Sequence, residues 1–267
     1  MQGLTLTAPA HWACVDVMSD LHLQASEPAT AAAWEQHLLS TPADAVFILG
    51  DLFEVWVGDD VLSDPAQPAG FEAACVKALR SAALHRSIFF LHGNRDFLIG
   101  PAFAQAASLS LLADPTLLEF GGKRWLLSHG DALCLDDTDY QHFRAEVRSA
   151  AWQQAFLAQP LADRKAVARS LREQSQARQR SALHYADLHH GATLDWLAQH
   201  RASVLIHGHT HRPGDHALGP GSSRMVLSDW DMNATPPRAE VLRLRLPDGK
   251  QSGASVQLQR IGVGAAA

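Results

Sequence analysis

The chain has 267 residues, 47% of them hydrophobic, which is enough for a sizeable core in one large α/β domain or two small ones. A formal net charge of −6 argues against a general nucleic-acid-binding protein, because such proteins normally carry a basic surplus. Three cysteines without Cys-x-x-Cys spacing predict a reducing compartment, and we expect neither a signal peptide nor a membrane-spanning run of roughly 20 apolar residues.

Short apolar segments rich in β-branched or aromatic residues predict five buried strands. They cover residues 14–18, 45–49, 87–91, 124–127 and 203–206. Helical patterns over 29–39 and 71–84 separate the first three strands, and this alternation predicts βαβ units with a partly parallel sheet. We therefore expect a single α/β domain over residues 1–267.

A polar cluster directly follows each of these five strands. The clusters are Asp20-Leu21-His22, Gly50-Asp51, Gly93-Asn94-Arg95-Asp96, His129-Gly130-Asp131 and His207-Gly208-His209-Thr210-His211. Ligand sites of open α/β sheets gather outside the carboxyl ends of the strands, so we expect the clusters to converge. A lone Asp-x-His or Gly-Asp is weak evidence, because both are ordinary core or turn chemistry. All five in one chain indicate a metal site.

The donor types narrow the choice of metal. Three imidazoles within five residues would repel one another if protonated, and a bound cation keeps them neutral. Carboxylate and amide oxygens mixed with imidazole nitrogens, without thiolates, favour Mn²⁺, Fe²⁺ or Zn²⁺. A pair of metals needs a bridging carboxylate, and Asp51 is the natural bridge because it has neither imidazole nor guanidinium beside it in sequence.

A long helical insertion is predicted between the fourth and fifth strands, at about 139–200. Its first helix covers 140–159 and ends at Pro160, and its second runs from Leu161 to about Arg180 with many arginines. This pattern fits either a packed helical hairpin with solvated charges or a lid over the metal site.

The tail that follows the fifth strand predicts three further strands, at 224–227, 240–246 and 256–261. Alternation of apolar and polar residues over 241–246 is typical of a half-exposed strand, so we expect an antiparallel edge region here.

The five clusters resemble the metal-binding motifs of the calcineurin-like metallophosphoesterases over most of residues 14–211. Longer stretches resemble the UDP-2,3-diacylglucosamine pyrophosphatase family of lipid A biosynthesis. These stretches are residues 19–23, 49–60, 92–98, 129–137, 140–144 and 206–213. The resemblance implies a β-sandwich flanked by helices, with a helical lid inserted at about 139–200.

The resemblance also implies two Mn²⁺ ions per chain. One ion is expected to be bound by Asp20, His22, Asp51 and His209. The other is expected to be bound by Asp51, Asn94, His129 and His207. His211 lies outside both sets in this pattern, so we expect it to have a supporting or structural role.

The implied reaction is hydrolysis of UDP-2,3-diacylglucosamine to UMP and 2,3-diacylglucosamine 1-phosphate, by attack of water on the α-phosphorus. The expected catalytic residues are Asp51, Asn94, Arg95 and His209. The expected substrate contacts are Asn94, Arg95, Asp137, Ser175, Arg180 and His207. Ser175 aligns with a substrate-contacting serine of the family. The family has an Asn and a Lys just beyond this serine, and neither is evident here. Arg180 stands in that stretch, and its guanidinium could still contact a phosphate.

Arg95 departs from the wider superfamily, in which many members have a proton-donating histidine after Gly-Asn. Arginine stays charged at neutral pH and cannot act as a proton donor. It can instead stabilise the negative charge of a phosphoryl transition state. A phosphate leaving group departs without protonation, so Arg95 favours a pyrophosphate bond over a simple monoester. The alternative is that Arg95 only pairs with Asp96.

The two acyl chains of the implied substrate predict a cytoplasmic protein that lies peripherally on the inner membrane. Attachment is expected through apolar side chains of the insertion, with Trp152, Phe156 and Leu157 as candidates. We expect no nucleic-acid or protein partner. Two alternatives stay open: a metallophosphodiesterase with a soluble nucleotide substrate, and a non-catalytic scaffold, which would be expected to lose metal ligands.

Overall fold

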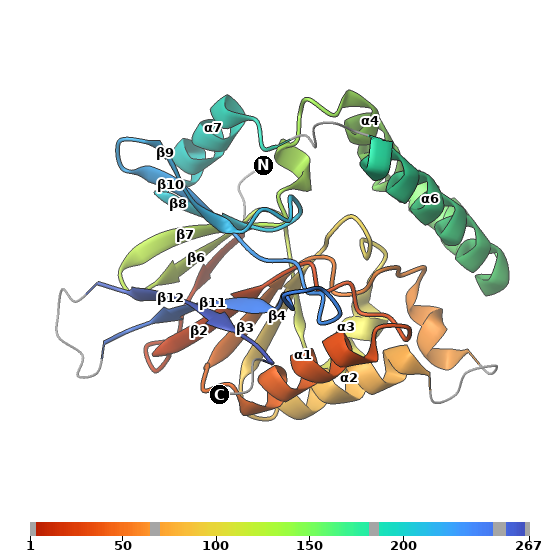
Figure 1. The fold of residues 1–267 in the computed structure, drawn as a ribbon, viewed down its shortest axis with the longest axis horizontal. Coiled ribbons are helices and arrows are strands. Elements are labelled where there is room, and N and C mark those ends of the chain that lie inside the picture. The colour runs from red at the N-terminus through yellow and green to blue at the C-terminus, as the bar shows by residue number, and fades with distance from the viewer. Residues whose placement is uncertain (1–3, 65–69, 182–186, 248–254, 265–267) are drawn as a thin grey trace.

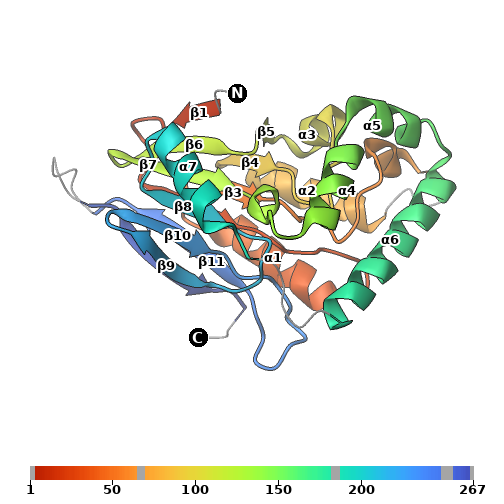
Figure 2. The ribbon, with the colours of Figure 1, turned by 90° about the horizontal axis from the view of Figure 1, so that it is seen from above.

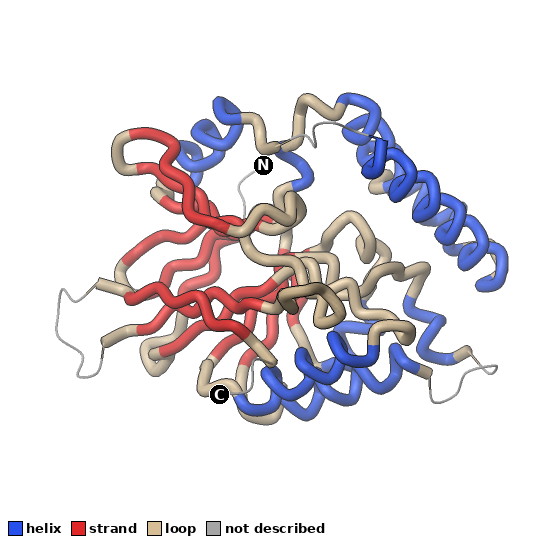
Figure 3. The backbone as a smooth tube through the Cα atoms, viewed as in Figure 1, coloured by secondary structure: helices blue, strands red, loops and turns tan. Residues whose placement is uncertain are grey.

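The computed structural model describes residues 4–64, 70–181, 187–247 and 255–264, with the backbone alone for 172–181. Two six-stranded sheets pack face to face (Figures 1 and 3). The first contains, in spatial order, β1 (Leu4–Thr7), β6 (Thr116–Phe120), β7 (Lys123–Ser128), β8 (Val204–His207), β10 (Ser222–Val226) and β9 (Gly214–Gly219). The second contains β12 (Gln257–Gly262), β11 (Glu240–Arg245), β2 (Cys14–Met18), β3 (Ala45–Leu49), β4 (Ser87–Leu91) and β5 (Ser110–Leu112).

Helices cover the outer faces of both sheets. The second sheet is covered by α1 (Pro28–Ser40), α2 (Phe71–Ala82) and α3 (Pro101–Ala107) (Figure 1). The outer face of the first sheet is covered by α7 (His190–His200), whose Leu197 packs with Leu126 and Leu205. The expected sandwich flanked by helices is therefore present.

The central strands β2 and β3 of the second sheet are buried on both faces, which explains their largely apolar sequences. In β3, Phe47 and Leu49 face the first sheet, whereas Val46 and Ile48 pack against the helices. β2 to β5 run parallel, and β11 and β12 are antiparallel at the edge. The predicted parallel core and antiparallel edge are both confirmed.

A buried carboxylate joins β2 to its neighbours. Asp16 is fully buried and accepts hydrogen bonds from Arg243 Nε at 2.7 Å and Arg243 Nη2 at 2.8 Å. The Thr41 hydroxyl donates to it at 2.5 Å, and His37 Nε2 lies 3.0 Å away. Burial raises the pKa of Asp16, but these hydrogen bonds, led by that of Arg243, outweigh it and hold the pKa at about 2.

The insertion between β7 and β8 begins with three helices, α4 (Thr138–Val147), α5 (Ala150–Leu157) and α6 (Leu161–Ser181), which gather at one end of the sandwich (Figure 2). The expectation of one helix over 140–159 was wrong, because Ser149 starts a new helix. Its backbone is extended and its hydroxyl accepts a hydrogen bond from Trp152 N at 3.2 Å, which is the geometry of a helix N-cap.

The first turn of α6 is attached to the segment that follows β3. The Arg164 side chain is only 2% exposed and donates hydrogen bonds to the Val57 carbonyl and the Asp60 carboxylate. Lys165 Nζ lies 2.9 Å from Asp64 Oδ2.

Across the described ranges, no helix combines the length and apolarity that crossing a bilayer would require.

Candidate metal centre

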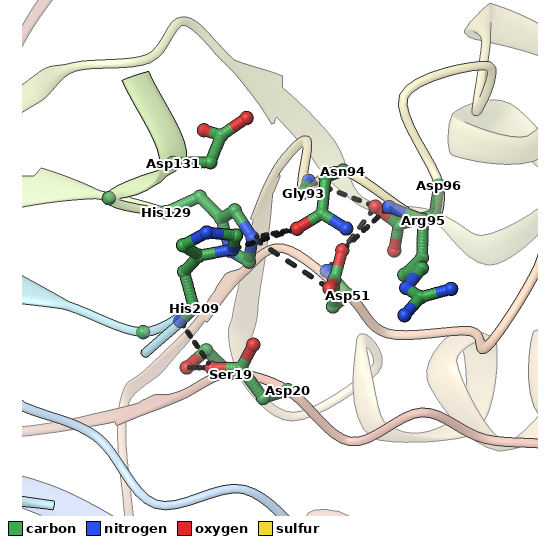
Figure 4. A network of polar contacts seen from close by, with 12 residues as sticks. Ser19, Asp20, Asp51, Gly93, Asn94, Arg95, Asp96, His129, Asp131 and His209 are labelled. Atoms are coloured by element: carbon green, nitrogen blue, oxygen red, sulfur yellow. Dashed lines mark hydrogen bonds and ion pairs between the residues drawn. The ribbon is translucent and has the colours of Figure 1, made fainter. Parts of the chain in front are cut away.

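The polar clusters meet where β2, β3, β4, β7 and β8 end (Figure 4). Parallel pairing brings the ends of β2, β3 and β4 to one edge of the second sheet, and parallel pairing of β7 with β8 does the same in the first. Backbone hydrogen bonds continue this alignment into the loops, from Asp20 N to Gly50 O at 3.1 Å and from Gly208 N to His129 O at 3.0 Å. The expected convergence is therefore present.

The backbone of these loops is unusual. Among the described residues, seven non-glycine residues have positive φ, and five of them belong to the clusters. These five are Asp20, His22, Asp51, His209 and His211. The left-handed region is unfavourable for residues with a side chain, and such strain persists mainly at functional sites. The fold therefore holds these side chains in orientations that the local sequence alone would not choose.

One group of ligating atoms is formed by Asp20, His22 and His211. His211 Nε2 lies 3.4 Å from Asp20 Oδ1 and 3.4 Å from His22 Nε2. These three residues offer ligand atoms within 4.8 Å of one another. Asp51 Oδ2 lies 3.9 Å from His22 Nε2, so Asp51 borders this group.

Asp51 also borders a second group, formed with Asn94, His129 and His209. Its Oδ2 atom lies 3.8 Å from His129 Nε2. Asn94 Oδ1 lies 2.9 Å from both His129 Nε2 and His209 Nδ1 (Figure 4). Asp51 thus stands between the two groups, as expected for a bridging carboxylate.

His207 is not brought into either group, although the resemblance implied that it binds an ion together with Asn94 and His129. His209, which the resemblance implied beside Asp20 and His22, has its Nδ1 atom 2.9 Å from Asn94 Oδ1 instead. His207 is the last residue of β8, so its side chain follows the alternation of the strand. Ile206 faces the interior between the sheets, whereas Leu205 faces α7, and His207 points to the same side as Leu205. Its Nδ1 atom lies 2.9 Å from the Gly208 carbonyl oxygen. His211 contacts Asp20 and His22, in contrast to the expectation that it lies outside.

The charges of the centre suit a cation. Burial lowers the pKa of His129, but the carboxylates of Asp51, Asp20 and Asp131 outweigh this effect and raise it to about 9. Burial together with the neighbouring His129 lowers the pKa of His209 to about 4. Two buried carboxylates, an amide oxygen and four imidazoles converge here, and this donor set fits a pair of divalent transition metals.

Asp96 supports the loops and does not engage Arg95. Its carboxylate is fully buried and accepts hydrogen bonds from Leu52 N at 2.7 Å and Gly93 N at 2.9 Å, which joins the loops after β3 and β4. Burial and the adjacent Asp51 carboxylate raise the pKa of Asp96 to about 7. The Arg95 guanidinium is directed elsewhere, with Nη1 at 3.9 Å from Glu54 Oε1.

Three further residues, Asp137, Ser175 and Arg180, were expected to contact the substrate. Asp137 caps α4, and its Oδ1 atom accepts a hydrogen bond from Tyr140 N at 3.0 Å. The side chains of Ser175 and Arg180 lie outside the described residues.

Of the apolar side chains expected at a membrane, Phe156 is 6% exposed and packs in the core, which removes it as a candidate, whereas Leu157 is 42% exposed.

Sequence reasoning missed a network between α4 and the metal centre. Tyr140, Arg144 and Arg148 are spaced four residues apart on one face of the insertion's start, and this spacing was the available signal. The buried Asp131 accepts hydrogen bonds from Tyr140 Oη at 2.6 Å and Arg144 Nε at 2.7 Å. The Tyr140 ring stacks on that of His209, with centroids 5.9 Å apart. The start of α4 is thus fixed to a candidate metal ligand.

Comparisons with known proteins agree with this geometry. The family model of the calcineurin-like phosphoesterases matches residues 15–213. A UDP-2,3-diacylglucosamine hydrolase of Chromobacterium violaceum is 45% identical over 225 residues, which cover 81% of this chain and 90% of the relative. Relatives of the same name from Aromatoleum aromaticum and Stenotrophomonas maltophilia are 46% and 42% identical, and the matches cover 81% and 80% of this chain and 89% of each relative. The chain therefore belongs to the calcineurin-like phosphoesterase family, together with these hydrolases.

Proposed function

We propose that this chain hydrolyses the pyrophosphate bond of UDP-2,3-diacylglucosamine, giving UMP and 2,3-diacylglucosamine 1-phosphate in lipid A biosynthesis. The observation that carries the proposal is Asp51 standing between two groups of ligands, with Arg95 beside it. The names of the relatives supply the substrate.

The proposed cofactor is two Mn²⁺ ions per chain. The proposed ligands of one ion are Asp20, His22, Asp51 and His211. Those of the other are Asp51, Asn94, His129 and His209. This assignment replaces His207 by His211, whose Nε2 atom lies against Asp20 and His22, and moves His209 to the ion of Asn94 and His129. When bound, such a pair of ions supplies a nucleophilic water at neutral pH and neutralises phosphate charge.

The protein's own contribution is to bind and orient the pyrophosphate. Arg95 N donates a hydrogen bond to Asp51 Oδ1 at 2.8 Å, so the backbone of Arg95 is tied to the shared carboxylate. Its guanidinium is proposed to bind the phosphoryl oxygens, where a permanent positive charge stabilises the charge that develops during attack. No side chain needs to protonate the leaving phosphate. Asn94 and His209 complete the proposed catalytic set.

The insertion is proposed to act as a lid for the acyl chains. Trp152 stacks on Phe156 with ring centroids 4.7 Å apart. Its ring lies 6.2 Å from that of Phe97, which follows Arg95 by two residues. Exposed apolar side chains on the same insertion include Leu157 and Val167. We propose that this surface holds the protein on the cytoplasmic face of the inner membrane.

The test of the function is a Mn²⁺-dependent assay on UDP-2,3-diacylglucosamine, with products identified by mass spectrometry and ¹⁸O-water as tracer. We expect UMP that carries the label, since water attacks the α-phosphorus. Rapid turnover of a soluble phosphodiester, with none of the lipid nucleotide, would show the alternative metallophosphodiesterase. A protein that retains no metal after purification and ignores added Mn²⁺ would support the scaffold.

The ligand assignment has its own test. His211→Ala should lower the bound manganese and reduce kcat by more than about 10-fold, because a ligand is lost. His207→Gln should keep both bound ions, since its imidazole faces the side of the sheet that α7 covers. Metal analysis of both proteins separates the two assignments. Loss of manganese from the His207 variant alone would restore His207 as a ligand, as the resemblance implied.

A further inference from the structure

Glu54 lies beside the metal centre, at a place set by the backbone. The parallel pairing of β2 with β3 continues beyond both strands, through hydrogen bonds from His22 N to Asp51 O at 3.0 Å and from Leu23 N to Leu52 O at 2.9 Å. Glu54 N then donates to Leu23 O at 3.2 Å. This extended pairing brings Glu54 next to His22, and the Glu54 side chain is 11% exposed.

One oxygen of the Glu54 carboxylate lies beside the His22 imidazole, within ion-pair distance. Glu54 Oε2 lies 2.9 Å from His22 Nδ1. An Nδ1–H that is held by a carboxylate fixes the tautomer and orientation of the ring and leaves Nε2 free for a metal. His22 Nε2 is the atom that faces His211 and Asp51, at 3.4 Å and 3.9 Å.

The other oxygen of the same carboxylate faces Arg95. Glu54 Oε1 lies 3.9 Å from Arg95 Nη1. The Arg95 backbone is fixed on both sides, because its N–H donates to Asp51 and its carbonyl accepts from Trp56 N at 3.1 Å. Within the described part of the chain, Arg95 Nε is buried and finds no hydrogen-bond acceptor. The guanidinium thus has donor capacity for an anion, and the Glu54 carboxylate lies beside it.

We propose that Glu54 is a positioning residue that fixes the His22 imidazole and the Arg95 guanidinium relative to each other. The inference rests on the proposed function, in which His22 binds a metal and Arg95 binds phosphate. One rigid carboxylate then determines the distance between the cation and the arginine. A pyrophosphate substrate must contact the metal and the Arg95 guanidinium at the same time. A small displacement of either group, caused by a change at Glu54, is therefore expected to lower kcat more than it weakens substrate binding.

The experiment compares Glu54→Gln, Glu54→Asp and the control Glu35→Gln, which makes the same chemical change on the exposed face of α1. Manganese affinity is measured by calorimetry and by EPR on the full-length protein, without substrate. We expect Glu54→Gln to weaken manganese binding about 10- to 100-fold, the usual effect of removing a carboxylate that supports a ligating histidine. Glu54→Asp keeps the charge but shortens the reach, so we expect weakened binding there too. The control should bind manganese like the parent.

The Arg95 contact is tested by a double-mutant cycle in kcat at saturating Mn²⁺. Glu54→Gln should lower kcat about 10-fold in the parent and much less in an Arg95→Ala background, because the arginine it positions is gone. Unchanged manganese affinity together with additive effects on kcat would overturn the proposal. Circular dichroism confirms that each variant is folded. The calorimetric result does not depend on the substrate, so the proposal can fail even where the assigned hydrolase activity is found.

Discussion

Gly93 precedes Asn94 and packs against Asp51 with no room for a side chain. A β-carbon at this position would lie 2.7 Å from Asp51 Cγ, and closer still to Oδ1 and to the backbone nitrogen of Asp51. Carbon atoms in contact settle at roughly 3.5–4.0 Å, so Gly93→Ala requires the shared carboxylate to move by about 1 Å. Asp51 lies against both ligand groups, so the displacement reaches both metals.

A displacement of about 1 Å in a catalytic group can lower the rate about 100-fold, or about 2.7 kcal/mol in the barrier. We therefore expect Gly93→Ala to reduce kcat by about this factor at saturating Mn²⁺, measured by UMP release. Gly262→Ala is the matched control, since a β-carbon there would meet nothing within 4 Å. A Gly93→Ala protein with more than half of the parent's kcat would refute the assignment of Asp51 as the bridge.

Four further results are expected. Asp51→Ala should lower the manganese content, measured by elemental analysis, below about two ions per chain. It should also reduce activity, measured by UMP release, more than about 100-fold. Full activity would exclude Asp51 as the carboxylate that bridges the two metals. The folded-state pKa of Asp16, about 2, lies below its unfolded value of about 3.9, so the carboxylate stabilises the fold above pH 4 and this contribution is lost as the pH falls toward 2. In urea unfolding with chelator, the advantage of the parent over Asp16→Asn should shrink by about 1 kcal/mol between pH 5 and pH 3, and a constant difference would contradict the low pKa. Trp152→Ala should raise KM about 10-fold for the diacylated substrate but not for its deacylated analogue. Equal changes in KM for both would show that the Trp152 ring only packs within the protein and does not contact the acyl chains. Tyr140→Phe removes the hydrogen bond to Asp131 while keeping the ring over His209, so it should cost about 1–3 kcal/mol of unfolding free energy with kcat nearly unchanged. A selective loss of kcat would instead indicate that the hydroxyl meets the substrate.

The sequence predicted the strands that carry the centre because those strands are buried on both faces and therefore read as apolar runs. β1, β5 and β9 were not predicted because they are edge strands with exposed or mixed side chains, and β6 was not predicted although it is an inner, largely buried strand. Pro160 marked a helix end correctly, whereas the cap at Ser149 was missed because residues on both sides of it favour a helix and no Gly or Pro separates them.

The ligand set of the last cluster was taken from the resemblance, which offers three histidines within five residues and does not by itself say which of them face the centre. The strand β8 includes His207, and the loop after it brings His209 and His211 to the other ligands. Only the folded backbone distinguishes these three imidazoles. The contacts of Glu54 lay beyond prediction for a different reason, since Arg95 is 41 residues away and only the folded chain brings the two together.

The candidate ligands come from both layers of the sandwich: Asp20, His22, Asp51 and Asn94 follow strands of one sheet, and His129, His209 and His211 follow strands of the other. Any divalent ion that engages ligands of both kinds cross-links two layers that are otherwise held together mainly by apolar packing. Its binding free energy then adds to the resistance of the protein to unfolding. Chelation should accordingly loosen this end of the molecule first, with hydrogen exchange accelerating in the loops after β3 and β8 before it does so in α2.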